Sequence, residues 1–85
     1  MQNKAKKIMA SAFIVDPADI HDGLTLGSIR EWDSLGHMRL VVAIEEFLGK
    51  TLDPHEVVAI RSLADVSRLL DAGDYQLTVN HGAKE

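Results

Sequence analysis

Apolar residues recur at three- and four-residue steps through most of this chain, and this spacing is the feature that most restricts its fold. In the first run, over residues 3–15, the recurring residues are Ala5, Ile8, Met9, Ala12 and Val15. A second run follows Ser34, with a predicted buried stripe of Leu35, Met38, Val41, Val42, Ile44 and Leu48. Period-two alternation occurs only over residues 76–79, too isolated to pair as a strand. The sequence therefore predicts an all-α protein.

Helix boundaries are marked by residues that favour the ends of helices. Asp16-Pro17 ends the first run and also fits the start of a short helical turn. The second helix begins at Asp33-Ser34 and ends at Gly49. A short third helix begins at Asp53-Pro54-His55-Glu56, where Asp53 caps and Glu56 completes a capping box. A fourth begins at Ser62, buries Leu63, Val66, Leu69 and Leu70, and ends near Gly73. We expect a small up-and-down four-helix bundle, with three longer helices and one short one, over residues 1–74, and a flexible tail over residues 75–85.

Length and charge exclude several classes of protein. With 85 residues the chain forms one domain and is too short for a large α/β enzyme. It has no cysteine for a disulfide, and a net charge of −4 argues against binding nucleic acid. No targeting segment is visible, and no apolar run approaches the ~18 residues of a membrane span. Its four histidines lack the spacing of metal ligands. We expect a monomer in the cytoplasm with no metal and no membrane contact.

A long connection over residues 20–32 leads into the second helix. Leu24, Leu26 and Ile29 are its expected anchors in the core. A connection of this length in so small a domain is uncommon, and such segments are usually functional.

Ser34 lies where this connection meets the second helix. A helix N-terminus offers free backbone N–H groups and partial positive charge, which favour a phosphate. We expect an exposed hydroxyl, with Gly36 leaving the approach to it uncrowded. Asp33-Ser34 taken alone is also a common capping arrangement.

The wider string is more specific. Trp32-Asp33-Ser34-Leu35-Gly36-His37-Met38, followed by Leu40-Val41-Val42-Ala43-Ile44-Glu45-Glu46, resembles the acyl carrier protein family, from about Ile8 to Leu70. The resemblance implies that a phosphopantetheinyl transferase attaches 4′-phosphopantetheine, taken from coenzyme A, to Ser34, with Asp33 assisting. It also implies a carrier without catalytic activity, which shuttles acyl thioesters between enzymes of a fatty-acid, polyketide or other specialised biosynthetic pathway.

The same resemblance suggests a surface that binds partner enzymes. Leu35 and Val42 match family positions that touch partners. The other candidates are Gly36, His37, Arg39, Glu45, Glu46, Glu56 and Val57. Many fatty-acid carriers have acidic residues at the positions of Gly36 and Arg39, so the second helix is less acidic here. We therefore expect dedicated partners: an acyl-activating ligase and acyl-transferring or condensing enzymes.

Two neighbouring residues have other expected roles. Trp32 is predicted to anchor the connection in the core, and His37 to lie on the surface, with a role beside the phosphate left open.

Alternative functions remain open. An aminoacyl or peptidyl carrier, for example of the D-alanyl type, is the closest, although those carriers commonly have a glycine pair before the serine. Asp33-Ser34-Leu35 also resembles part of the motif of Gly-Asp-Ser-Leu serine hydrolases, but Trp32 replaces the glycine and no strand precedes it. An unmodified helical adaptor would instead keep Ser34 free.

Overall fold

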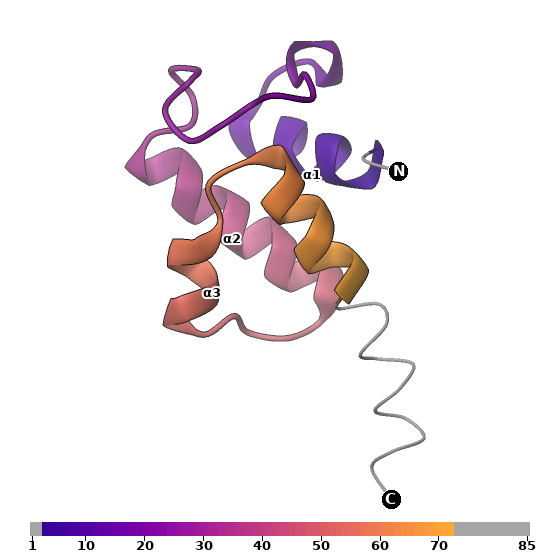
Figure 1. Cartoon of the computed structure of the whole chain (residues 1–85), viewed down its shortest axis with the longest axis vertical. Coiled ribbons are helices and arrows are strands. Elements are labelled where there is room, and N and C mark those ends of the chain that lie inside the picture. The colour runs from indigo at the N-terminus through magenta and orange to yellow at the C-terminus, as the bar shows by residue number, and fades with distance from the viewer. Residues whose placement is uncertain (1–2, 73–85) are drawn as a thin grey trace, which may run out of the picture.

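The computed structural model describes residues 3–72. They form α1 (Asn3–Phe13), the 3-10 turn η1 (Pro17–Asp19), α2 (Ser34–Leu48), α3 (Pro54–Ala59) and a further helix over residues 63–72. In Figure 1, α2 crosses the middle of the molecule, and the connection between α1 and α2 runs over one end. Within the described residues the sole β feature is an isolated bridge between Thr25 and Ser62. The predicted all-α bundle of three longer helices and one short helix is confirmed, while the predicted helix end at Gly73 and the tail over 75–85 lie outside the described residues.

The four helix starts after α1 are each capped by the expected side chain. The carboxylate of Asp53 accepts the backbone N–H of Glu56 at 2.9 Å, and the Glu56 carboxylate accepts the N–H of Asp53 at 3.0 Å. These two bonds form the predicted capping box. The other starts are capped by Asp16, Asp33 and Ser62. At the other end of α2, Gly49 has φ 72°, the left-handed conformation that suits glycine.

The first helix ends earlier than its apolar spacing predicts. α1 stops at Phe13, and Ile14 takes a left-handed φ of 59°. The backbone N–H of Val15 turns back to the carbonyl of Ala10 at 3.0 Å, and that of Ile14 to Ser11 at 3.3 Å. This pair of bonds closes the helix before Asp16-Pro17 is reached. Val15 is still half-buried against the core, as its place in the apolar pattern predicts, but it lies outside the helix.

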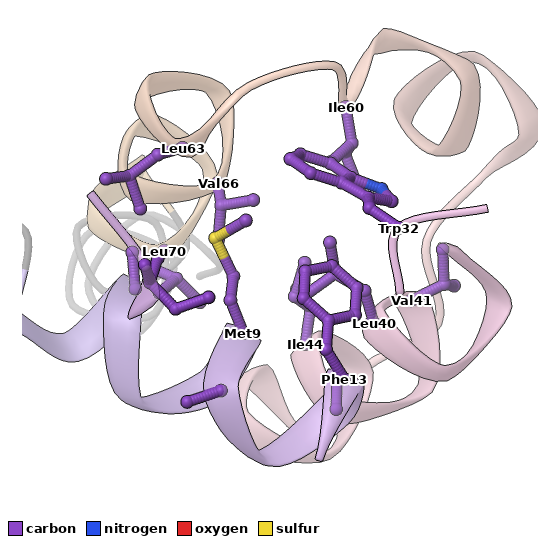
Figure 2. Close-up of a cluster of buried hydrophobic side chains, with 14 of the residues drawn as sticks. Met9, Phe13, Trp32, Leu40, Val41, Ile44, Ile60, Leu63, Val66 and Leu70 are labelled. Atoms are coloured by element: carbon purple, nitrogen blue, oxygen red, sulfur yellow. The ribbon is translucent and has the colours of Figure 1, made fainter. Parts of the chain in front are cut away.

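The core lies where α1, α2 and the helix over 63–72 meet, and the connection before α2 covers one end of it. Figure 2 shows Met9 of α1 pointing toward Val66, and Phe13 of α1 lying beside Leu40 of α2 with Trp32 above it. Trp32 has no exposed surface, and its ring centroid lies 5.4 Å from that of Phe13. This aromatic pair lies in the core beside the start of α2. The anchoring role predicted for Trp32 is confirmed.

The buried stripe of α2 differs from the predicted one. Val41, Ile44 and Leu48 are buried as expected, together with Leu40 and Gly36. The prediction was wrong for three residues, which are exposed by 50–60%: Leu35, Met38 and Val42. Apolar residues surround much of α2, so spacing alone fits two faces, and the buried face is chosen by the neighbours that pack on it.

The connection before α2 is held by the backbone of a distant segment. The N–H of Leu26 donates to the carbonyl of Arg61 at 2.8 Å, and the N–H of Leu63 donates to that of Leu24 at 3.0 Å. Leu24 is fully buried and Ile29 is half-buried, as predicted. Leu26 was expected to be buried as well, but it is 46% exposed because it faces a surface hollow.

Candidate functional site

Ser34 is the first residue of α2, and it is exposed. The Asp33 carboxylate accepts the backbone N–H of Gly36 at 2.9 Å, which leaves the serine hydroxyl outside the cap. The first turn of α2 contains no acidic residue, and the Asp33 carboxylate just before it is bonded to the Gly36 N–H. Leu26, Gly27 and Met38 line a hollow beside Ser34, together with Trp32, Asp33 and His37. An accessible hydroxyl at a helix N-terminus, next to an open hollow, fits a serine that carries a phosphodiester and a long arm.

Gly36 has a different role from the one expected. It is buried, and a Cβ atom at this position would overlap the carbonyl oxygen of Glu31. The glycine thus allows the connection to cross close over the first turn of α2. This close crossing positions Asp33 and Ser34 at the start of α2. Because Gly36 is buried, it has little exposed surface that a partner could contact.

His37 is not the surface residue that the sequence predicts. Its ring is part-buried, and Nδ1 lies 3.0 Å from the indole Nε1 of Trp32. Its Nε2 lies 2.9 Å from the backbone carbonyl oxygen of Val57 in α3. An indole nitrogen can only donate, so Nδ1 is the acceptor and Nε2 carries the hydrogen. His37 therefore joins the connection, α2 and α3.

These bonds also limit what Ser34 can do. The nearest histidine in sequence, His37, has both ring nitrogens engaged, so neither is free to take a proton from the Ser34 hydroxyl. A nucleophilic serine needs such a base. His37 is therefore not arranged to serve Ser34 as a base.

The candidate partner residues separate into two groups. Leu35, Arg39, Val42 and Glu46 are exposed on α2. Glu45 instead accepts the backbone N–H of Leu52 at 2.9 Å, and Glu56 belongs to the α3 capping box. The remaining candidates, Gly36, His37 and Val57, are buried or half-buried.

The sequence did not indicate all of the exposed apolar residues on and beside α2. Met38, assigned to the core, and Ile14, assigned no role, are exposed, and both line one hollow with Val42 and Arg39. Val58 on α3 is 63% exposed. Met38 lies three residues after Leu35 and four before Val42, so the spacing could have indicated that these residues share a face; it did not indicate that this face is exposed.

Two other features bear on the site. Among residues 3–72, no three His, Cys, Asp or Glu side chains lie close enough together to hold a metal ion. No helix over the same residues has the length and apolar character needed to cross a membrane.

The sequence was compared with models of known protein families and with curated proteins. A family model described as "phosphopantetheine attachment site" matches residues 4–70, a span that contains Ser34, α2, α3 and all of α1 except its first residue. No curated protein matches the chain by sequence.

Proposed function

The chain belongs to the phosphopantetheine attachment site family, whose members carry covalently attached 4′-phosphopantetheine, and we propose that Ser34 is the residue that carries it here. The observation that supports Ser34 most directly is its place as the exposed first residue of α2, capped by Asp33. Once attached, the arm supplies a thiol that holds cargo as a thioester. Because the chain has no cysteine, this is the only thiol such a carrier can use.

Attachment is a group transfer in which the transferase supplies the catalysis. The Ser34 oxygen forms a bond to phosphorus, the pyrophosphate bond of coenzyme A breaks, and adenosine 3′,5′-bisphosphate leaves. The serine proton passes to a base of the transferase, since His37 has no free ring nitrogen. The Asp33 carboxylate caps the first turn of α2, which leaves the Ser34 hydroxyl outside the cap.

We further propose that the cargo is an acyl group, handed between an acyl-activating ligase and acyl-transferring or condensing enzymes of a fatty-acid, polyketide or other specialised pathway. The protein would act in the cytoplasm as a monomeric carrier without catalytic activity of its own, folded over residues 1–74. Partners would bind the exposed side chains of α2 around Leu35, Arg39 and Val42. Intact-protein mass spectrometry of the native holo form distinguishes this cargo from an aminoacyl group.

The attachment is tested with coenzyme A, Mg²⁺ and a broad-specificity phosphopantetheinyl transferase. We expect the wild-type chain to gain the mass of one phosphopantetheine and Ser34→Ala to gain none. Ser11→Ala removes another exposed serine and is the matched control, which should be modified like the wild type. A folded wild-type chain that stays unmodified, beside a carrier that the same enzyme modifies, would refute the proposal.

A further inference from the structure

The His37 ring is held from two sides, and one protonation state alone fits both contacts. The indole N–H of Trp32 donates to Nδ1 at 3.0 Å, and Nε2–H donates to the Val57 carbonyl at 2.9 Å. The two rings are nearly parallel, at 13°, with centroids 6.3 Å apart. A second proton, on Nδ1, would set one N–H donor against another and remove the bond to Trp32. The bond to Val57 would survive, because an imidazolium donates from Nε2 more strongly.

Trp32 is the residue through which this loss would reach Ser34. Its side chain is fully buried, so an indole N–H without an acceptor is costly. Its backbone also holds the connection together: the N–H donates to the Ile29 carbonyl at 3.1 Å, and the carbonyl accepts the N–H of Gly27 at 3.2 Å. Ser34 follows two residues later. Movement of the indole would therefore loosen the segment that places Asp33 and Ser34.

The charged groups around His37 do not replace the lost bond. Those that share a hollow with it are Asp33, Arg61 and Asp65. The Asp33 carboxylate is bonded to Gly36, and that of Asp65 to Arg61 and Arg68. On α3, the carboxylates of Asp53 and Glu56 close the capping box.

We propose that His37 is a positioning residue for Ser34. The neutral His37 ring holds the Trp32 indole, and the protonated ring releases it. A proton on Nδ1 removes the acceptor of the Trp32 indole N–H, so the segment before Ser34 loosens when His37 is protonated. α3 stays attached through Val57. The link to Ser34 modification rests on the proposed function, whereas the contact between His37 and Trp32 does not.

Trp32 is the only tryptophan of the chain and reports directly on this contact. We would measure its fluorescence, and the hydrogen exchange of its backbone amide, from about pH 8 to about pH 5. His37→Gln keeps an acceptor and a donor but does not titrate, and His55→Ala removes an exposed histidine of α3. Circular dichroism at both ends of the range checks that each protein is folded.

We expect a reversible fluorescence change in the wild type and in His55→Ala, and none in His37→Gln. Exchange at Trp32, corrected for the intrinsic effect of pH, should become about tenfold faster in the wild type on acidification, since one buried hydrogen bond shifts a local equilibrium by about that factor. A wild type without this change, or a His37→Gln variant that shows it equally, overturns the proposal. Should His37→Gln fail to fold, His37→Asn takes its place under the same criteria.

A second measurement extends the test to Ser34. The modification rates of wild type and His37→Gln are compared at about pH 7.5 and about pH 5.5, so that the pH response of the transferase cancels in their ratio. We expect the ratio of wild type to variant to fall about threefold or more at the lower pH, and a constant ratio would show that loosening does not reach Ser34. If Ser34 is not modified at all, the proposed function fails, while the fluorescence result still decides the contact between His37 and Trp32.

Discussion

The start of α2 depends on single residues that lie close to the backbone of the preceding connection. Gly36 lies under the carbonyl oxygen of Glu31, and Asp33 caps the same turn. Both residues act on the backbone, so the geometry at Ser34 depends on side chains that never touch its hydroxyl.

Gly36→Ala should therefore destabilise the protein. The added methyl group overlaps the Glu31 carbonyl, which must move, and we expect a loss of about 2 kcal/mol or more in the free energy of unfolding. Urea denaturation followed by circular dichroism measures it. Gly23→Ala is the control, because a Cβ atom there meets nothing within 4 Å. Equal stability of the two variants would contradict the close approach.

Ile14 is strained by its own backbone conformation and not by a close neighbour. A β-branched residue at φ 59° is unfavourable, and this side chain is 75% exposed, so little burial compensates for it. We expect Ile14→Gly to raise the free energy of unfolding by about 1 kcal/mol, measured by urea denaturation. Ile14→Val keeps the β-branch and should change little. A destabilised glycine variant would mean that the exposed isoleucine contributes contacts that outweigh the strain.

At the scale of elements, side chains satisfy backbone N–H groups at the helix starts. Ser62 accepts the backbone N–H of Asp65 at 3.1 Å, and the Asp65 carboxylate accepts the N–H of Arg61 at 3.0 Å. Burial acts to raise the pKa of Asp65, but the bonds from Arg61, Ser62 and Arg68 outweigh it and hold that pKa below its ordinary value. The charged carboxylate thus stabilises the start of the helix over 63–72.

This pKa shift predicts a pH-dependent stability. Because the folded pKa is lowered, the stabilisation is present above the ordinary value of 3.8 and is lost as pH falls through the folded pKa. Asp65→Asn should lower the free energy of unfolding by about 1 kcal/mol near pH 7, and the difference should shrink below about pH 4. Asp71→Asn, an exposed acid on the same helix, is the control. A difference that persists undiminished in acid would count against the charge as its cause.

At the scale of the whole molecule, charge is distributed unevenly along α2. The net charge is −4, yet the first turn of α2 has no acid, and the exposed acids Asp33 and Glu46 lie toward its two ends. Between them Arg39 lies beside the exposed apolar side chains of Met38 and Val42. In the described part of the chain Arg39 forms no ion pair, so its charge remains available to a partner.

Arg39→Glu should therefore change the choice of partner. If charge excludes this carrier from fatty-acid synthase enzymes with basic docking surfaces, the reversal should tighten binding about three- to tenfold, as measured by calorimetry at low salt. Lys50→Glu makes the same change in net charge just beyond α2 and should have a smaller effect. Unchanged affinity in Arg39→Glu would show that shape, and not charge, separates the partners.

By itself the sequence determined the helical class, the helix starts at Asp33, Asp53 and Ser62, and the serine at the start of α2, because caps and spacing act within a few residues of the chain. It could not determine which face of α2 is buried, since apolar residues surround much of that helix. Nor could it predict that Gly36 faces the Glu31 carbonyl or that His37 bridges Trp32 and Val57. Only the tertiary structure decided these, because each depends on which segments meet in space. The pairing of His37 with Val57 joins residues 20 positions apart, a separation that no local pattern encodes.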